Sequence, residues 1–190
     1  MNADANIRCF IALELPGPAQ KNLEELIGSL QAAQADVKWV APENIHLTLK
    51  FLGEIPMTGV ENVKMIVQRS RGRHLRIATR FGSAGAFPGL KKPEVVWVGL
   101  DAGLEELRRI QQDVEGQAAD LGFYREPRRF QPHLTLGRVR SQKNIAELSR
   151  AIGELRPPAA EFELARLSLI QSTLTPRGPV YQIMETAELD

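Results

Sequence analysis

The chain has 190 residues, of which 43% are hydrophobic and 25% charged, and its formal net charge is +1. This composition excludes a disordered or fibrous protein, and the small net charge argues against a general polyanion-coating protein while leaving room for a local basic cleft. The single cysteine, Cys9, cannot form an internal disulfide, and no signal-peptide pattern or membrane-length apolar run is present. We therefore expect a cytoplasmic enzyme or binding domain with a buried thiol.

The first half of the chain predicts the order strand, helix, strand, helix. The apolar run at 8–15 (RCFIALEL) predicts a strand, and a helix follows with Pro18 near its start. The apolar residues at helical spacing in this helix are Leu23, Leu26, Ile27 and Leu30. Residues 39–53 are then extended, and Thr58 and Glu61 have the spacing of a capping box at the start of a second helix. The apolar stripe of that helix is Val60, Val63, Ile66 and Val67.

The second half repeats this order. The expected elements are strands at 75–81 and 94–100, a helix at 104–121, a helix at 144–155, and strands at 161–170 and 180–186. The helix at 104–121 ends at Gly122, and its opening GLEEL is similar to NLEEL at residues 22–26. No low-complexity linker separates the halves.

The tetrapeptide HLTL occurs at residues 46–49 and again at 133–136, in matching places of the two halves. These copies contain two of the three histidines in the chain. We therefore predict a duplicated unit whose copies pack about a pseudo-twofold axis as two lobes of one domain spanning residues 1–190. Because the duplication already supplies a twofold site within one chain, we expect a monomer.

Side chains alternate along a strand, so His46 and Thr48 share one face, as do His133 and Thr135. Two imidazoles with an ordinary pKa of about 6.5 can act as an acid and a base near neutral pH. The threonine hydroxyls can donate hydrogen bonds to phosphoryl oxygens. The pattern indicates displacement at phosphorus by general acid-base catalysis, which requires neither a metal nor a cofactor.

Other interpretations of these residues stay open. A single histidine in an apolar strand is usually structural, and the doubling is what favours catalysis. Two histidines without a third nitrogen, sulfur or carboxylate ligand make a poor zinc site. The third histidine, His74, lies in the arginine-rich stretch RSRGRHLR, which is typical of a solvated surface.

Three further residues are candidates for substrate contact. Arg138, just after the second motif, is the best candidate for a phosphate contact among basic residues that are otherwise typical of solvated faces. Trp39 and Phe10 are candidates for stacking on a base of single-stranded RNA. Packing in the core is an equal alternative for both rings.

The chain resembles a known family over nearly its full length, from RCFIALELP through WVAPENIHLTLKFLGE, FPGLKKPEVVWVGL and FQPHLTLGRV to LSLIQSTLTPRGPVYQI. On these stretches it is similar to the 2H phosphoesterase superfamily, which is named for two His-x-Thr-x motifs. Within that superfamily it resembles the LigT-like RNA 2′,3′-cyclic phosphodiesterases, formerly called 2′-5′ RNA ligases. The resemblance implies an α+β fold of two pseudo-symmetric lobes, each an antiparallel sheet backed by helices, around a central cleft.

The resemblance also implies a reaction, in which water opens a terminal 2′,3′-cyclic phosphate on RNA and leaves a 2′-phosphate. By carry-over, His46 is the proton donor to the departing 3′ oxygen and His133 is the proton acceptor from water. With an RNA 5′-hydroxyl in place of water, the same chemistry gives a 2′-5′ linkage. The implied partner is an RNA with a cyclic phosphate end, tRNA halves being one candidate. The alternatives are a non-catalytic module that binds nucleotides or RNA ends, and a phosphodiesterase for a small cyclic nucleotide.

Overall fold

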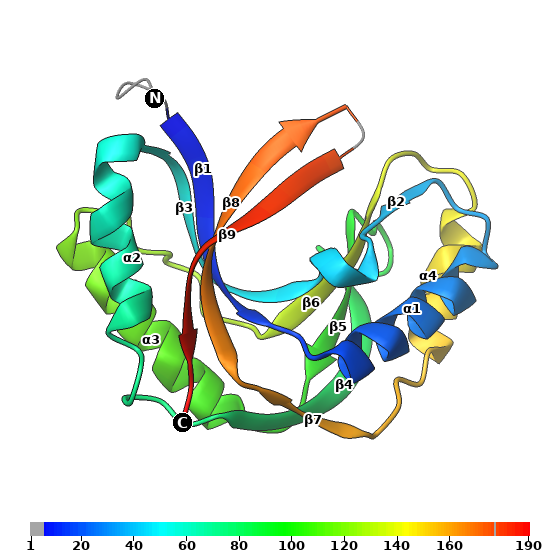
Figure 1. The fold of residues 1–190 in the computed structure, drawn as a ribbon. Coiled ribbons are helices and arrows are strands. Elements are labelled where there is room, and N and C mark those ends of the chain that lie inside the picture. The colour runs from blue at the N-terminus through cyan, green and yellow to red at the C-terminus, as the bar shows by residue number, and fades with distance from the viewer. Residues whose placement is uncertain (1–5, 177) are drawn as a thin grey trace.

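The computed structural model describes residues 6–176 and 178–190, which form two antiparallel sheets with helices on their outer sides (Figure 1). The first sheet has the order β3-β1-β8-β9, with β1 at Asn6–Glu14, β3 at His46–Pro56, β8 at Arg166–Thr175 and β9 at Gly178–Glu188. The second has the order β2-β6-β5-β4-β7, with β2 at Val37–Trp39, β4 at Ile77–Phe87, β5 at Val95–Leu100, β6 at His133–Val139 and β7 at Glu161–Leu164. The predicted α+β class is confirmed.

The two halves of the chain repeat one unit. In the first, β1 is followed by α1 (Gly17–Gln31) and then by β3, which pairs antiparallel with β1 and begins with HLTL. In the second, β5 is followed by α3 (Leu104–Asp120) and then by β6, which pairs antiparallel with β5 and also begins with HLTL. The predicted duplication is therefore present as two equivalent strand–helix–strand units.

A β-bulge recurs at the same motif position in both units. Along β3 the pairing with β1 skips Leu49, and along β6 the pairing with β5 skips Leu136. Each is the last residue of its HLTL copy. A bulge inserts one unpaired residue and so reverses the alternation of faces beyond it. The residues that follow the two motifs, Lys50 and Gly137, therefore point to the face that alternation alone would not predict.

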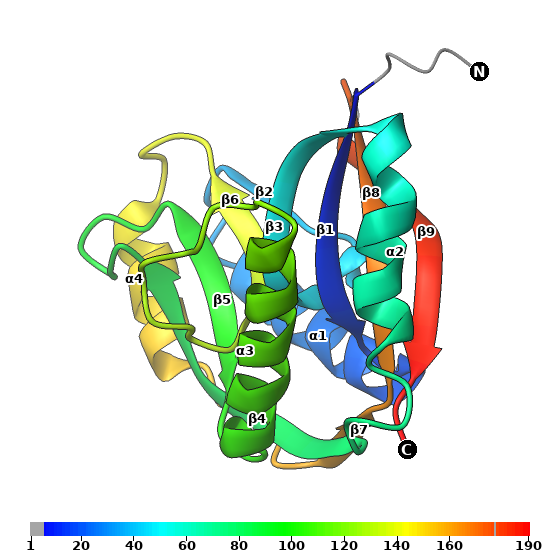
Figure 2. The same ribbon diagram turned by 90° about the vertical axis from the view of Figure 1, so that its left-hand side faces the viewer.

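The connecting helices are exchanged between the two halves. Helix α3 contacts β3 of the first sheet and lies beside α2 (Val60–Gln68), as Figure 2 shows. Helix α1 lies beside α4 (Ile145–Glu154), which contacts β4 of the second sheet (Figure 1). One apolar cluster contains buried residues of both sheets and all four of these helices. No helix of the described part is long and apolar enough to cross a membrane.

Three details differ from the sequence-based expectation. The extended segment expected at 39–53 is interrupted by a 3₁₀ helix at Pro42–Asn44, because β2 belongs to the second sheet and β3 to the first. The single strand expected at 161–170 is two strands, because the chain leaves the second sheet after β7 and enters the first at β8. The prediction of a capping box at Thr58 and Glu61 is wrong, because the N-cap residue of α2 is Gly59 and no side chain forms a capping hydrogen bond. Thr58 instead lies inside a short 3₁₀ turn at Met57–Gly59.

The entry into α3 depends on Gly103, which has a φ of +64°. A Cβ at this position would lie 2.6 Å from the carbonyl oxygen of Ala78 and 2.7 Å from Cγ2 of Ile77. Gly103→Ala is therefore expected to lower the free energy of unfolding by about 1–3 kcal/mol, measured by urea denaturation. The control is Gly116→Ala in the middle of the same helix, where nothing lies within 4 Å of the added Cβ. That variant should be more stable by up to about 1 kcal/mol, and equal effects at both positions would contradict the prediction.

Candidate active site

The two HLTL motifs begin β3 and β6, strands of different sheets that contact each other (Figure 1). All four leucines of the motifs are buried, whereas His46, Thr48, His133 and Thr135 are partly exposed. The predicted division of each motif into a core face and an accessible face is therefore confirmed. Two imidazoles and two hydroxyls reach accessible faces of adjacent strands.

Both histidines are held in the same way. Nδ1 of His46 lies 2.8 Å from the carbonyl oxygen of Asn44, and Nδ1 of His133 lies 2.8 Å from the carbonyl oxygen of Gln131. A carbonyl oxygen only accepts, so each Nδ1 donates its proton. In both rings Nε2 is the nitrogen left for chemistry, since it carries a lone pair in the neutral ring and a proton in the charged ring.

Aromatic rings enclose His46. Its imidazole stacks on Phe10 with ring centroids 4.5 Å apart and meets the edge of Tyr181 at 5.4 Å. Burial lowers the pKa of His46 from its ordinary value of 6.5 to about 4, although the hydrogen bond to the Asn44 carbonyl acts in the opposite direction. His46 is therefore neutral at pH 7 in the free protein.

His133 has different surroundings. It makes edge contacts with Phe87 and Trp97, with centroid separations of 5.0 and 6.4 Å, and borders a pocket of about 500 Å³. The pocket is also lined by Phe130, Arg108, Arg129, Ser83 and Asp101. Within the described part of the chain, Nε1 of Trp97 and Nε of Arg108 are buried without a hydrogen-bond partner. The pocket thus combines flat rings with cationic donors.

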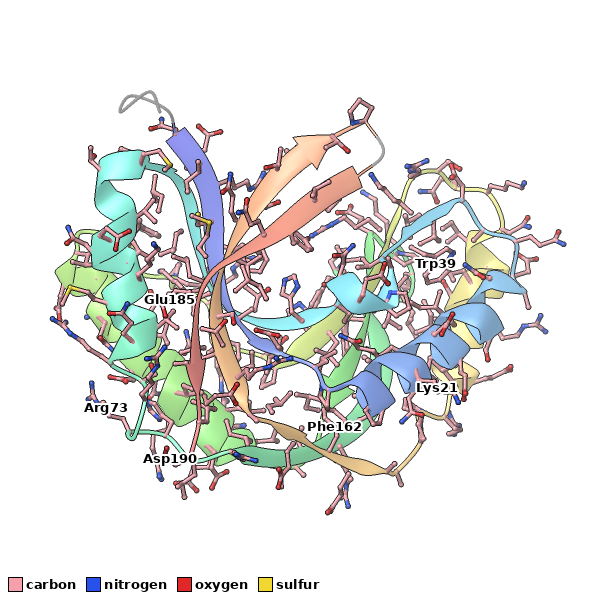
Figure 3. The ribbon with its side chains drawn as sticks, viewed as in Figure 1. Lys21, Trp39, Arg73, Phe162, Glu185 and Asp190 are labelled. Carbon is pink, nitrogen blue, oxygen red and sulfur yellow. The ribbon has the colours of Figure 1, made fainter. Side chains whose placement is uncertain are left out.

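The three candidates for substrate contact lie in different environments. Phe10 is only 3% exposed, so packing, here against His46, is the alternative that the structure supports for this ring. Trp39, on β2 (Figure 3), is partly exposed and packs over Gly137. Arg138 is exposed. Burial raises the pKa of Tyr181, and the positive charges of Arg138 and Arg8 lower it. The charge of Arg138 therefore acts on the ring that contacts His46. Substrate contact by Trp39 and Arg138 stays a prediction.

His74 is not the solvated residue that its arginine-rich neighbours indicate. Its side chain is 12% exposed, and Nε2 lies 2.9 Å from a carboxylate oxygen of Asp113 on α3. The reason is tertiary, because the segment between α2 and β4 passes over α3. Among residues 6–176 and 178–190, no three His, Cys, Asp or Glu side chains form a group that could hold a metal ion.

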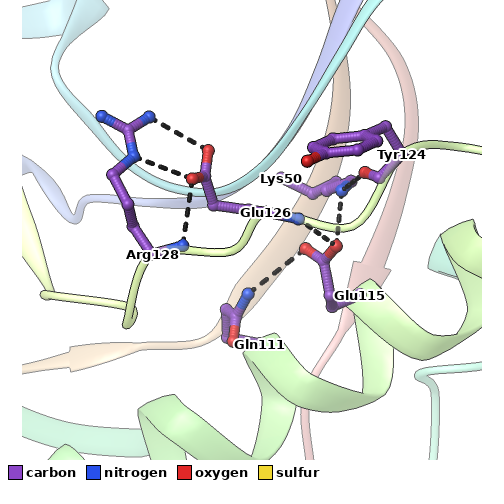
Figure 4. A network of polar contacts seen from close by, with 6 residues as sticks. All are labelled: Lys50, Gln111, Glu115, Tyr124, Glu126 and Arg128. Carbon is purple, nitrogen blue, oxygen red and sulfur yellow. Dashed lines mark hydrogen bonds and ion pairs between the residues drawn. The ribbon is translucent and has the colours of Figure 1, made fainter.

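Sequence reasoning missed Lys50, the residue after the first motif. Its Nζ lies 2.6 Å from Oε1 of Glu115 and 2.6 Å from the carbonyl oxygen of Tyr124 (Figure 4). Strict alternation places Lys50 on the same face as His46, but the bulge at Leu49 turns it toward α3. The only signal in the sequence is a lysine between apolar residues of a strand.

The fold and the paired His-x-Thr strands define an α+β protein built from two copies of one unit. A family model described as "LigT like Phosphoesterase" matches residues 13–97 and again 98–181, which correspond to the two halves. The chain belongs to this LigT-like phosphoesterase family.

The curated relatives are similar over most of their length. The RNA 2′,3′-cyclic phosphodiesterase of Methanothermobacter thermautotrophicus is 32% identical over 184 residues, covering 96% of this chain and 99% of that protein. The RNA 2′,3′-cyclic phosphodiesterase of Aeropyrum pernix is 34% identical over 163 residues, covering 85% and 92%. The crystal structure of TT0787 of Thermus thermophilus superposes with a TM-score of 0.80 at 26% identity and covers 96% of this chain and 98% of that one.

The burial of His46 predicts a stability that falls with acid. Because the folded-state pKa of about 4 lies below the ordinary 6.5, the unfolded chain binds more protons between these values. The free energy of unfolding contributed by His46 is therefore complete above about pH 6.5 and decreases by about 3 kcal/mol as the pH falls to about 4. His46→Gln removes the titrating group, so its stability should fall less over this range in urea denaturation from pH 7 to pH 4. Parallel pH profiles for both proteins would show that His46 is not buried as described.

Proposed function

We propose that this protein hydrolyses terminal 2′,3′-cyclic phosphates on RNA to 2′-phosphates by acid-base catalysis between two histidines. The observation that carries the proposal is the pair of contacting HLTL strands, in which both imidazoles are held through Nδ1 and leave Nε2 free. The names of relatives that are 32% and 34% identical support the same reaction. Neither a metal nor an organic cofactor is needed, because the two imidazoles supply both proton transfers.

In this mechanism Nε2 of His133 takes a proton from water, and the water oxygen bonds to phosphorus. The bond from phosphorus to the 3′ oxygen breaks, and that oxygen takes the proton from Nε2 of His46. The hydroxyls of Thr48 and Thr135 donate to the non-bridging oxygens and stabilise their growing charge. The assignment of donor and acceptor follows the resemblance to the family.

The low pKa of His46 is compatible with the role of acid once substrate is bound. The cyclic phosphate carries a negative charge, and an opposite charge within a few ångströms favours the protonated imidazole. His46 would therefore take up a proton as the substrate enters. Because the proton is taken up only on binding, the His46 ring carries no unpaired charge in the free protein.

We assign the pocket beside His133 and the exposed Arg138 to binding of the RNA end. Aromatic faces stack on bases of any sequence, and guanidinium groups pair with phosphates. Trp39 is a further candidate for base stacking. The parallel reaction, in which an RNA 5′-hydroxyl replaces water as the nucleophile and a 2′-5′ linkage forms, uses the same groups. We place this activity in a monomer in the cytoplasm, where the buried Cys9 stays reduced, with tRNA halves as one candidate substrate.

The test is to incubate the protein, in EDTA, with a short RNA ending in a 2′,3′-cyclic phosphate and to identify the product by mass and by phosphatase sensitivity. A 2′-phosphate is expected. His46→Ala and His133→Ala should each lower the rate by at least about 10²-fold while the far-ultraviolet circular dichroism stays unchanged. The control is His74→Ala, which removes the one histidine outside the motifs and should retain activity.

Three outcomes would separate the alternatives. Near-native activity of either motif variant would exclude the two-histidine mechanism. Turnover of a nucleoside 2′,3′-cyclic monophosphate without turnover of RNA would favour a small cyclic nucleotide as substrate. Tight nucleotide binding without turnover of either would favour a non-catalytic module.

The threonines predict a separate effect. Thr48→Val and Thr135→Val keep the shape of the side chain but remove the hydroxyl donor, so each should lower kcat by about 10²-fold. Thr48→Ser and Thr135→Ser keep the hydroxyl and should retain most of the activity. Steady-state kinetics on the cyclic phosphate RNA would check this, and equal losses in the valine and serine variants would argue for a packing role.

A further inference from the structure

Lys50 connects the first motif strand to the segment that leads into the second motif. This segment, residues 121–132, contains no helix or strand and ends immediately before His133. Lys50 is 5% exposed and donates to the carbonyl of Tyr124 in the segment and to Glu115 on α3. Glu115 in turn accepts, at 3.0 Å, from the backbone N–H of Glu126 (Figure 4). Two backbone groups of the segment are thus fixed by one buried ion pair.

The segment matters because it carries the carbonyl that holds the catalytic ring. Gln131, five residues after Glu126, accepts from Nδ1 of His133. Arg128 further stabilises the segment by donating to both carboxylate oxygens of Glu126, at 2.8 and 3.1 Å (Figure 4). A shift of the segment would therefore move the Gln131 carbonyl and loosen the hold on His133.

The second motif shows the reciprocal arrangement. Gly137 follows the second bulge as Lys50 follows the first, and it pairs with Trp39 on β2. A Cβ at Gly137 would lie 2.6 Å from Cγ1 of Val37 and 2.9 Å from Cε3 of Trp39, so only glycine leaves room for β2. From β2 the chain runs through the 3₁₀ helix η1 (Pro42–Asn44) to the carbonyl that holds His46.

We propose that each motif histidine is positioned from the opposite half of the chain. Lys50, with Glu115, positions His133 through residues 121–132, and Gly137, with Trp39, positions His46 through residues 39–44. Lys50 is a positioning residue, because it is buried on the helix side of β3 and cannot touch substrate. The catalytic consequence rests on the proposed function, whereas the positioning itself is a property of the fold.

The chemistry of the buried pair fits positioning better than stability. A buried ion pair adds little net stability relative to apolar side chains of similar size. An apolar pair, however, could bind neither the Tyr124 carbonyl nor the Glu126 N–H. Lys50 donates to the Tyr124 carbonyl and to Oε1 of Glu115, and the same oxygen accepts from the Glu126 N–H, so the pair holds both backbone groups.

Lys50→Met keeps the length of the side chain and removes its donors. We expect kcat for the cyclic phosphate RNA to fall on the order of 10–100-fold with little change in KM, because misplacement of a catalytic group by about 1 Å has effects of this size. In ¹⁵N NMR of the neutral rings, the fraction of His133 protonated on Nδ1 should fall while that of His46 is unchanged. Gly137→Ala should do the converse, changing His46 and leaving His133 unchanged.

Two further variants separate positioning from folding. Lys50→Met combined with Glu115→Leu leaves no unpaired buried charge, so it should fold as well as the wild type and still show the His133 change. If Lys50→Met alone does not fold, this double variant takes its place. Arg109→Met combined with Glu105→Leu removes an exposed ion pair from the same helix and should alter neither ring.

The proposal would be overturned if Lys50→Met altered the tautomer of His46, its near neighbour on β3, in place of His133. It would equally be overturned if both rings and kcat stayed within about twofold of the wild type. Because the tautomer signals require no turnover, they test the positioning even if the protein acts on a different substrate. Absence of RNA turnover by the wild type would count against the proposed function alone.

Discussion

The hydrogen bond from Nδ1 of each histidine to the carbonyl two residues before it is the interaction on which the rest of the site depends. It fixes the tautomer and aims Nε2, and it does so at His46 and at His133 with the same length of 2.8 Å. A carbonyl held by a loop is only as well placed as that loop. The fold therefore has to fix two short segments, residues 39–44 and 121–132, as firmly as the motif strands themselves.

The exchanged helices and the repeated bulge meet this requirement. Helix α3 of the second half packs on β3 of the first sheet, and α1 of the first half lies beside α4, which contacts the second sheet, so one large apolar cluster contains buried side chains of both halves. The bulge after each motif then turns the next residue away from the accessible face. After the first motif that residue is Lys50, which binds the segment at 121–132. After the second motif it is Gly137, which leaves room for the ring of Trp39. The duplicated geometry is kept while the chemistry of the two positions has diverged.

Identical tetrapeptides also end in unequal surroundings. Phe10 and Tyr181 pack against His46 and reduce its contact with water, whereas His133 borders a pocket with aromatic and cationic walls. Two titratable groups in different environments can divide the roles of acid and base even though their local sequences are the same. The asymmetry lies in residues that are distant in the chain from both motifs, on β1 and β9 for His46 and on β4 and β5 for His133.

The sequence by itself determined the motifs, their faces, most elements of the chain and the duplication. These features are local, because the period of side chains along a strand or helix depends only on neighbouring residues. Tertiary structure decided where the chain changes sheets after β7, that Phe10 packs on His46, that His74 pairs with Asp113, and that Lys50 faces α3. Each of these depends on which strands pair and at what register. A single unpaired residue such as Leu49 reverses the faces of the residues that follow it, and only the pairing with the partner strand reveals it.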